Sequence, residues 1–390
     1  IRSIDSKDIP SLKEILGKEN IEKVNVKDVL YLLYENNSST LLIDARSEKE
    51  FEDSSIPYSV NFPVLNNSER HNTGLIYKKY SRSSALYLAM EYANPKMDSL
   101  NRFLSSHNAS DKIIIIYCWR GGGRSGYLSK MISELGYKPM ILTGGQKSFR
   151  KYVNDFFAQE PFPFELIEIS GLTGSGKTEL LKAVSVSLPV IDLEDAAKHY
   201  SSLLGHIPYE IKNIPAVTNQ SAFENNIFSQ IFFNKFNKKA LPDNCNSGTS
   251  GPLTFLIESE SKKVGSFQIP ENLYNKMKSA TGIRIITTLE NRVKRIVNDY
   301  FGTDLKGIEP MKRIIIEKVN FFRQQLSKNI YDKAILLLDQ KRVEEFTEIM
   351  IVEYYDKKYT DKGKKPCAEI FYNDLDTAQK ELLSLVKKLV

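Results

Sequence analysis

The part of the sequence that most constrains the fold is residues 171–178, which read GLTGSGKT. An apolar run at 164–169 predicts a strand before this segment, and residues 178–186 predict a helix after it. The spacing matches G-x-x-x-x-G-K-[ST], a loop whose glycines let consecutive backbone N–H groups point at a phosphate near the helix N-terminus. A nest of amides binds any diphosphate, so the loop does not reveal which one it holds. The residues expected to contact phosphate are Gly171, Thr173, Gly174, Ser175, Gly176, Lys177 and Thr178.

Such a loop is often accompanied by an acidic residue, at the end of a neighbouring strand, that holds Mg²⁺ through a water molecule. Asp192 follows Pro-Val-Ile and Glu258 follows Leu-Thr-Phe-Leu-Ile, so both are candidates. The sequence ESES at 258–261 is not a standard metal-binding aspartate motif. The metal therefore stays unknown at this stage, with Mg²⁺ as the candidate ion, and the bound anion need not be a nucleotide.

A second anion-binding loop is expected at 118–125, which reads CWRGGGRS and joins a buried strand candidate to a helix candidate. The N–H groups of the turn, the helix N-terminus, Arg120 and Arg124 would all favour a thiolate on Cys118. Cys118 is therefore predicted to have a lowered pKa and to act as a nucleophile, with both arginines beside it. The rest of the anion cradle comprises Gly121, Gly122, Gly123 and Ser125; Cys245 and Cys367 are assigned no role.

Strand and helix signals alternate along most of the chain, which predicts an α/β protein with parallel sheets. Strands are expected at 39–44, 111–118, 137–142, 164–169, 190–193, 253–257 and 283–288. A helix is expected at 125–135, with Gly136 as its cap, and a turn at 143–145. From Arg292 on the chain is mainly helical, with a basic break at 354–366 before a last helix at 374–390.

The sequence EPFP at 160–163 cannot continue a helix and is read as a linker between two domains. The expected organisation is an N-terminal extension at 1–22, a first parallel-sheet domain at 23–158, a second α/β domain at 164–300 and a mainly helical region at 301–390. The polar segment 234–251 is read as an exposed loop.

Composition excludes several classes of protein. Among the 390 residues, 41% are hydrophobic and 26% are charged, which is typical of globular chains rather than disordered or fibrous ones. No apolar run approaches the roughly 18 residues that span a bilayer, and the first ten residues lack a signal-peptide core. The chain starts at Ile1, so we expect a trimmed product, located in the cytoplasm without a membrane partner. Three cysteines are too few for a disulfide framework, and a net charge of +6 permits a polyanionic partner without demonstrating one.

The first half of the chain resembles the rhodanese domain. Residues 43–46, IDAR, match the Asp-x-Arg at a strand end of that family, and residues 142–145, LTGG, match its closing turn. Residues 50–57 and 61–63 match the segment between them. Ser54-Ser55 and Tyr58-Ser59 depart from the usual Gly-His and Gly-Ala, in a turn away from the cysteine loop.

The cysteine loop also fits C-x5-R, the pattern of cysteine phosphatases and arsenate reductases, although Tyr117 stands where tyrosine phosphatases carry His. Its three glycines and Arg120 instead resemble the loop of the tRNA 2-selenouridine synthases, which join a rhodanese domain to a P-loop NTPase-like α/β domain in this order. Segments 220–225, 257–261 and 352–356 also resemble that family, over about residues 25–360. Further family-matched residues are Asn66, Asn67, Arg70 and His199.

This resemblance implies a transferase that replaces the sulfur of wobble 2-thiouridine in tRNA with selenium. The co-substrates would be geranyl diphosphate, which makes an S-geranyl intermediate, and selenophosphate, supplied by another enzyme. We expect the P-loop to hold the prenyl diphosphate rather than to hydrolyse a nucleotide, since a standard second acidic motif is missing. Cys118 would carry or deliver selenium, as in a Cys–Se adduct, while Arg120 and Arg124 hold selenophosphate.

A tRNA substrate needs a basic surface. Candidate phosphate contacts are Arg292, Lys294, Arg295, Lys357, Lys358, Lys362, Lys364 and Lys365. Tyr354 and Tyr355 could stack on a base, but packing on a helix is favoured for both.

Three alternatives stay open. The first is an ATP-dependent tRNA sulfurtransferase with a persulfide on Cys118 and a P-loop that activates the base by adenylation. The second is a C-x5-R phosphatase or arsenate reductase fused to a small-molecule kinase. The third is a nucleotide-gated binding module with a vestigial rhodanese domain. These alternatives are distinguished by which anion the enzyme uses as donor and by whether it requires a nucleotide.

Overall fold

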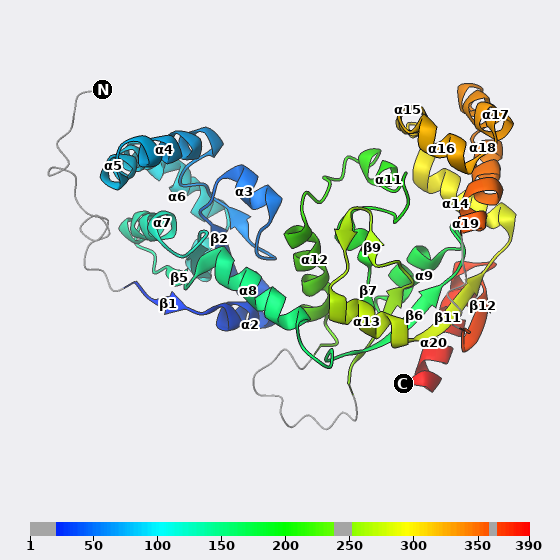
Figure 1. Ribbon diagram of the computed structural model, residues 1–390. Coiled ribbons are helices and arrows are strands. Elements are labelled where there is room, and N and C mark those ends of the chain that lie inside the picture. The colour runs from blue at the N-terminus through cyan, green and yellow to red at the C-terminus, as the bar shows by residue number, and fades with distance from the viewer. Residues whose placement is uncertain (1–20, 238–251, 359–364) are drawn as a thin grey trace. The chain divides into compact units, whose positions relative to one another are not determined.

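The computed structural model describes residues 21–237, 252–358 and 365–390, and it divides into two compact units. Among the described residues, unit 1 runs to Phe156 and unit 2 from Phe157 to the C-terminus, so the division falls at the end of α8 (Gly145–Phe157). Each unit contains a parallel sheet with helices around it, which confirms the predicted α/β class (Figure 1).

The sheet of unit 1 has the strand order β1-β5-β4-β2-β3, and every paired neighbour is parallel. The central pair, β4 and β2, is in register from Thr40↔Ile113 to Asp44↔Tyr117, so the residues that follow both strands meet at one edge. Three strands of this sheet, β2, β4 and β5, confirm the strands predicted at 39–44, 111–118 and 137–142. The strands of this sheet are β1 (Lys23–Val24), β2 (Thr40–Asp44), β3 (Val60–Asn61), β4 (Ile113–Tyr117) and β5 (Met140–Leu142).

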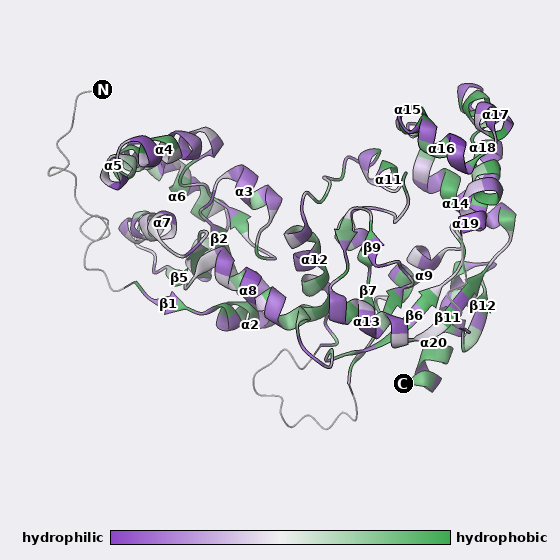
Figure 2. Cartoon of the chain, in the orientation of Figure 1, coloured by the Kyte–Doolittle hydropathy of each residue, from purple (hydrophilic) through white to green (hydrophobic). Residues whose placement is uncertain are grey.

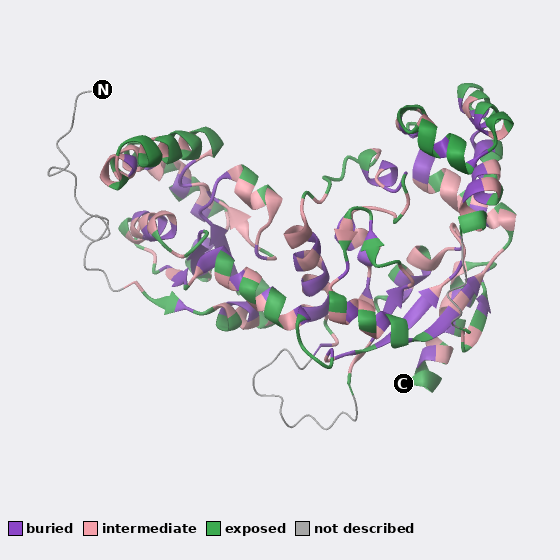
Figure 3. Ribbon diagram, viewed as in Figure 1, coloured by how far each residue is buried: buried purple, intermediate pink, exposed green. Residues whose placement is uncertain are grey.

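The core of unit 1 forms where apolar residues of β2 and β4 pack against helices, with Ile43 and Ile116 fully buried. Gly136, with a φ of +89°, follows α7 as the sequence predicts for a cap. The pair α4–α5 contributes much less to the core, because α4 has no buried residue and is mostly exposed, while α5 buries only Ala85 and Ala93 (Figure 3). The helices are α2 (Val26–Asn36), α3 (Glu48–Asp53), α4 (Asn67–Lys79), α5 (Arg82–Ala93), α6 (Met97–Ser106), α7 (Gly123–Glu134) and α8, with 3-10 turns η1 (Asn37–Ser39), η2 (Asn94–Lys96) and η3 (Ala109–Asp111).

The larger sheet of unit 2 has the order β12-β11-β6-β8-β7, again with every paired neighbour parallel. The sequence did not predict β12, because only Ile370 of its residues is buried and Phe371 is 64% exposed. An edge strand of this kind lacks the continuous apolar run of β6 or β8. The strands are β6 (Glu165–Ser170), β7 (Val190–Ile191), β8 (Thr254–Glu258), β11 (Thr281–Ile286) and β12 (Ala368–Phe371), and β9 (Lys263–Val264) pairs antiparallel with β10 (Phe267–Gln268).

The last helix, α20 (Leu375–Leu389), returns to this sheet. Ala378, Leu382 and Val386 share a buried cluster with Leu180 and Leu181 of α9. The chain therefore leaves the sheet for a helical region and comes back to it. The other helices of unit 2 are α9 (Lys177–Val184), α10 (Leu193–Ala197), α11 (Ile207–Glu210), α12 (Gln220–Phe232), α13 (Glu271–Ser279), α14 (Leu289–Phe301), α15 (Ile308–Glu317), α16 (Val319–Gln325), α17 (Lys328–Asp339), α18 (Val343–Met350), the π-helical turn η5 (Ile351–Tyr355) and α19 (Asp356–Lys358).

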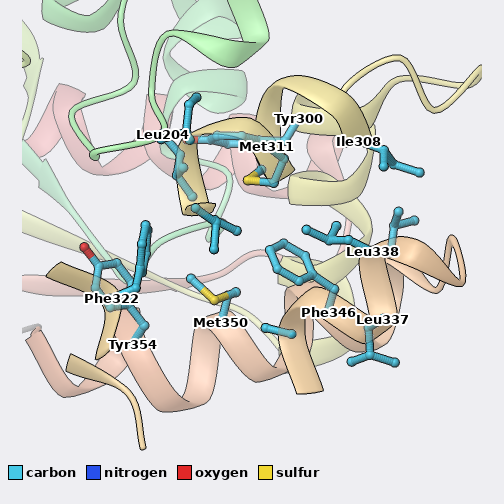
Figure 4. Close-up of a cluster of buried hydrophobic side chains, with 14 of the residues drawn as sticks. Leu204, Tyr300, Ile308, Met311, Phe322, Leu337, Leu338, Phe346, Met350 and Tyr354 are labelled. Carbon is cyan, nitrogen blue, oxygen red and sulfur yellow. The ribbon is translucent and has the colours of Figure 1, made fainter. Parts of the chain in front are cut away.

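The helical region has its own buried cluster, built from α14 to α18 together with Leu204, Ile207 and Tyr354 (Figure 4). The helices mix hydrophilic and hydrophobic residues, as amphipathic helices around a core do (Figure 2). Tyr354 belongs to this cluster, with its ring 5.6 Å from that of Phe322, which confirms packing over base stacking. The predicted break at 354–366 is therefore wrong at its start, because helical structure continues through Lys358.

Among the described residues, no helix combines the length and the apolar character that crossing a membrane would require. Most of the predicted loop at 234–251 and of the extension at 1–22 lies outside the described residues, as do Lys362, Lys364 and Cys245.

We expect Phe346→Ala to destabilise unit 2 by about 3–5 kcal/mol, because the side chain is 2% exposed and its ring contacts Phe301. Urea denaturation of the full chain followed by circular dichroism measures the loss. The one tryptophan, Trp119, lies in unit 1 and reports the unfolding of that unit separately by fluorescence. Leu336→Ala is the control, because Leu336 is 52% exposed. Equal losses in both variants would contradict the assignment of the core.

Candidate active site: a cysteine loop and a phosphate-binding loop

Cys118 directly follows β4 at the carboxyl edge of the unit 1 sheet, with only 4% of its surface exposed. Its Sγ accepts a hydrogen bond from the Gly122 N–H at 3.3 Å and lies 3.3 Å from the Ser125 hydroxyl. Burial by itself would raise the pKa of the Cys118 thiol. Hydrogen bonds from the Ser125 hydroxyl and from the N–H groups of Ser125, Arg120 and Gly122 outweigh burial and hold this pKa below its ordinary value. The direction agrees with the prediction from the sequence.

The turn at 143–145 packs against the backbone of the cysteine loop. Gly145 has a φ of +54°, and a Cβ on it would lie 2.0 Å from the Cys118 carbonyl oxygen, so only glycine fits. The Gln146 N–H donates to that same oxygen at 2.8 Å, and the Lys147 N–H donates to the Trp119 carbonyl at 3.0 Å. The loop is thus fixed by backbone contacts from the start of α8.

The two arginines of the loop differ. Arg124 makes an ion pair with Glu50 (Nη1–Oε2 2.5 Å), which also pairs with Arg70 (Nε–Oε2 2.8 Å). Burial tends to raise the pKa of Glu50, but Arg124 and then Arg70 lower it to about 2. The charge of Arg124 is therefore matched by Glu50 rather than by the thiolate. Arg120 is exposed and has no ion-pair partner among the residues that the structure describes.

The family-matched residues Asn66 and Asn67 fix the start of α4. Asn66 caps the helix by accepting from the Glu69 N–H at 2.8 Å. Asn67 accepts from the Lys49 N–H and donates its own N–H to Glu48, each at 3.0 Å, so it ties α4 to α3. These residues therefore position Arg70 and the wall of the cysteine site.

Tyr117 has a structural place beneath Cys118. Its hydroxyl accepts from the Ile56 N–H at 3.2 Å and lies 2.9 Å from the Ser59 hydroxyl. Burial raises the pKa of Tyr117 well above its ordinary value, so the phenol stays neutral. The sequence places the turn with the departures from the rhodanese pattern away from the cysteine loop, but the structure packs it against the residue that precedes the cysteine.

In unit 2 the P-loop joins β6 to α9, and other parts of the chain lie close to its glycines. A Cβ on Gly171 would lie 2.6 Å from the Ile285 carbonyl oxygen, and a Cβ on Gly176 would lie 2.4 Å from the Tyr372 ring. Tyr372 directly follows β12, and its hydroxyl donates to Glu179 at 2.7 Å. Lys177 Nζ donates to the Gly171 and Leu172 carbonyls at 3.0 and 3.4 Å, which keeps the ammonium group at the loop.

Arg292 was predicted as a surface contact for RNA, and the structure contradicts this. The side chain is buried, its Nε donates to the Thr173 carbonyl at 2.8 Å, and its Nη2 pairs with Asp356 at 2.6 Å. Arg292 therefore holds the P-loop against α19.

The Thr178 hydroxyl faces a group of carboxylates. It lies 2.6 Å from Glu258 Oε1 and 3.2 Å from Glu194 Oε2, and one carboxylate oxygen each of Glu194, Glu258 and Glu260 lie within 4.8 Å of one another. Glu258 is 1% exposed, and its Oε2 has no hydrogen-bond partner among the described residues. Burial raises the pKa of Glu194 and Glu258, and like charge raises it further. Hard oxygen donors with an unpaired buried oxygen fit a divalent cation such as Mg²⁺.

Asp192 does not join this group. It caps α10 by accepting from the Asp195 N–H at 2.8 Å, and burial with the Glu258 charge raises its pKa to about 6. The sequence thus identified Glu258 among the clustered carboxylates but missed Glu194 and Glu260. Their spacing was the signal that could have found them, because Glu194 lies two residues after Asp192 and Glu260 lies two residues after Glu258.

The cavity above the P-loop has a volume of about 690 Å³. Lys177, Lys182 and Arg295 line it together with the three glutamates. Aromatic and apolar side chains also line it, namely those of Tyr200, Leu203, Ile296, Tyr300 and Tyr355. Such a cavity suits an oxyanion that carries an organic group.

His199, also family-matched, lies beside this cavity without lining it. Burial, and then His206, lower its pKa to about 4, so the ring is neutral at physiological pH. A Cβ on Gly265 would lie 3.0 Å from the ring, so His199 packs against the turn between β9 and β10.

Most of the remaining candidate contacts for RNA form ion pairs with nearby carboxylates. Lys294 pairs with Glu290, Arg295 with Glu179, and Lys357 with Glu353. Lys358 lies over the rings of Phe321 and Tyr354 and lines the P-loop cavity. Lys365 is exposed.

Comparison with known proteins decides the family. A family model described as the tRNA 2-selenouridine synthase AAA domain matches residues 164–388, and a rhodanese-like domain model matches residues 26–152. This chain belongs to the tRNA 2-selenouridine synthase family.

Three relatives named tRNA 2-selenouridine synthase show how far the similarity extends. The Bdellovibrio bacteriovorus protein is 32% identical, over 71% of this chain and 68% of its own. The Nitrosomonas eutropha protein is 31% identical, over 78% and 74%. A Shewanella protein (strain MR-7) is 25% identical, over 88% of this chain and 93% of its own length. The two domains of the family thus occur here in the predicted order.

We expect Ser125→Ala to raise the pH midpoint of Cys118 alkylation by iodoacetamide by about one unit, since the thiolate loses a hydrogen-bond donor. In the unchanged chain the midpoint lies below the ordinary value of a thiol, and the rate falls as pH drops through it. Mass spectrometry of the Cys118 peptide gives the rate, and Ser129→Ala, one helical turn further along α7, is the control. A midpoint that Ser125→Ala leaves in place would contradict the assignment.

We expect Mg²⁺ to raise the midpoint of thermal unfolding of unit 2, because an ion that binds only the folded state stabilises it. Glu258→Gln should abolish most of this shift, since it removes the buried carboxylate beside Thr178. Glu309→Gln, an exposed carboxylate on α15, is the control. An equal Mg²⁺ shift in both variants would show that the ion binds elsewhere.

Proposed function

We propose that this chain is a transferase that replaces the sulfur of wobble 2-thiouridine in tRNA with selenium, through an S-geranyl-2-thiouridine intermediate. The observation that supports this most is the pairing, in one member of the tRNA 2-selenouridine synthase family, of a thiolate-stabilising cysteine loop with a separate phosphate-binding loop. Geranyl diphosphate and selenophosphate are the proposed co-substrates, one for each loop. A tRNA substrate would place the enzyme in the cytoplasm, with a selenophosphate-supplying enzyme as a partner.

The first step alkylates the base, because a thiocarbonyl sulfur leaves poorly until it carries an alkyl group. The sulfur attacks C1 of geranyl diphosphate, a C–S bond forms, and the C–O bond breaks as diphosphate leaves with the electron pair. The base loses its N3 proton to water in this step. The P-loop amides and Lys177 would stabilise the charge that develops on the leaving diphosphate.

The residues around Thr178 add to this support. Glu194, Glu258 and Glu260 would hold Mg²⁺, which supplies further neutralisation of the diphosphate when bound. The rings of Tyr200, Tyr300 and Tyr355, which line the P-loop cavity, suit the allylic chain.

The second step delivers selenium at the cysteine loop. The Cys118 thiolate attacks the phosphorus of selenophosphate, an S–P bond forms, the P–Se bond breaks, and hydroselenide leaves with the electron pair. Cys118 thus delivers selenium while it carries the phosphoryl group, in place of the Cys–Se adduct expected from the sequence, which would need an oxidant. Hydroselenide adds at C2 of the alkylated base, the C–S bond breaks, and geranyl thiolate leaves with the proton that selenium carried. The base regains its N3 proton from water, and water cleaves the S–P bond to release phosphate. No oxidant or reductant is needed.

The geometry of the loop supports this role for Cys118. Its thiolate is held by the Gly122 N–H and the Ser125 hydroxyl, and the loop has the C-x5-R spacing of phosphoryl-transfer cysteines. Arg120, exposed at the loop, is the cation available to a bound selenophosphate. Arg124, held by Glu50, would fix the shape of the cradle.

Mass spectrometry of tRNA nucleosides tests the proposal, after incubation with thiolated tRNA, geranyl diphosphate and selenophosphate, with each component omitted in turn. Lys177→Ala should slow geranylation by about 10²–10³-fold. Cys118→Ser should accumulate the S-geranyl nucleoside without selenium. Lys333→Ala, an exposed residue of α17 outside both cavities, is the control. Full selenation by Cys118→Ser would remove its role, and a strict need for ATP with no use of geranyl diphosphate would favour the sulfurtransferase alternative.

A further inference from the structure

A cavity of about 840 Å³ opens directly beside Cys118 in unit 1. One wall is the cysteine loop, with Trp119, Arg120 and Gly122. Residues of the helix pair α4–α5, whose helices lie side by side (Figure 1), also line it. The volume lies in the range of about 300–1,000 Å³ typical of small-molecule sites.

The walls of this cavity are mostly apolar. Buried Val64 and Leu65 lie at its base, and Leu86, Ala89 and Met90 of α5 line its side. Large apolar side chains also stand exposed at its edge, where Leu75 is 39%, Trp119 44% and Tyr77 59% exposed. Exposed apolar groups gathered in one place mark a binding surface.

Cationic groups also line this cavity, namely Arg70, Lys78, Arg82, Arg120 and Arg124. Arg70 and Arg124 are paired with Glu50, whereas the other three have no ion-pair partner in the part of the chain that the structure describes. The lining thus combines apolar side chains, cations and the anion-binding cysteine loop. A ligand that fits this charge pattern has an apolar group joined to a polyanion.

Gly74 is an exposed residue in the lining of this cavity. It lies within α4, where glycine is unfavourable because it loses more conformational entropy than any other residue. It lines the cavity, and a Cβ placed on it would meet nothing within 4 Å. Neither the backbone conformation of Gly74 nor a close neighbour requires glycine at this position. A larger side chain would therefore fit here, and it would occupy the free space of the cavity.

Selenophosphate cannot account for this cavity, because it is small and fully ionic and needs only the loop. We infer that the cavity holds the branched isoprenoid chain of the S-alkylated base, while the RNA backbone meets Lys78 and Arg82. This inference rests on the proposed function, in which the alkylated C2 must lie beside Cys118 when selenium is delivered. The same pocket receives the geranyl thiol that leaves.

The cavity would therefore select the alkyl group. An S-geranyl chain buries apolar surface between α5 and Trp119, whereas an S-methyl group is too short to do so. Each lost methylene weakens binding in an apolar pocket, so we expect an S-geranyl substrate to react at least about tenfold more efficiently than its S-methyl analogue.

The test uses the full-length protein with selenophosphate and two tRNA anticodon stem-loops, one carrying S-geranyl- and one S-methyl-2-thiouridine at the wobble position. Formation of 2-selenouridine is followed by mass spectrometry. In the unchanged chain the kcat/KM ratio of S-geranyl to S-methyl should be about ten or more. Gly74→Phe fills the cavity and should reduce this ratio about tenfold. Asn101→Phe adds the same ring at an exposed position of α6 outside the cavity and should leave the ratio unchanged.

Each outcome separates the inference from the proposed function. If the unchanged chain converts neither RNA, the proposed function fails at its second step. If it converts both equally well and Gly74→Phe leaves the ratio in place, the function stands and the chain-binding pocket is overturned. If Gly74→Phe slows both substrates by the same factor, or slows iodoacetamide alkylation of Cys118 in the free protein, the variant disturbs the loop and the inference is likewise overturned.

A second arm distinguishes the source of the chain. The S-geranyl RNA should protect Cys118 from iodoacetamide at concentrations where geranyl diphosphate does not, because the proposal places the base-linked chain in the cavity. Equal protection by geranyl diphosphate would instead assign the cavity to the free prenyl donor, and the inference would be wrong.

Discussion

Both candidate sites depend on one constraint, which is that a chain turning from a strand into a helix can aim several N–H groups at an anion only where no Cβ interferes. At the cysteine loop, Gly145 lets the next turn approach the Cys118 carbonyl. At the P-loop, Gly171 and Gly176 allow contact with β11 and with the Tyr372 ring. The unpaired N–H groups at each helix start then face the ligand. The side chains that do chemistry are arranged around these two turns.

The charged residues of both sites are held by specific partners. Glu50 binds Arg124 and Arg70, and Asp356 binds Arg292 beneath the P-loop. Neutral donors, the Gly122 N–H and the Ser125 hydroxyl, therefore stabilise the Cys118 thiolate. A thiolate stabilised in this way stays nucleophilic while the cysteine loop keeps Arg120 available to a phosphate. Exposed cations line a cavity together with apolar side chains, and the proposed chemistry needs both.

Local patterns account for what could be predicted. The consecutive apolar residues of β4 and β8 predict buried strands in any context, and the glycines predict the turns that follow them. Strand β12 could not be predicted, because an edge strand with one buried residue carries little periodic signal. Arginine is usually a surface residue, so the sequence places Arg292 on the surface. Only its contact with the Thr173 carbonyl shows that the side chain holds the P-loop instead. Glu194 and Glu260 likewise become site residues only because the fold brings them to Glu258.

The sequence by itself determined the two loops, their order, the family and the α/β class, because each of these is written in short segments whose backbone geometry is local. The tertiary structure alone decided which carboxylates meet Thr178, which arginines are paired, and that the helix pair α4–α5 encloses an apolar space beside Cys118. These contacts join residues far apart in the chain. They arise when apolar faces pack and bring distant side chains together, and no local pattern encodes that distance.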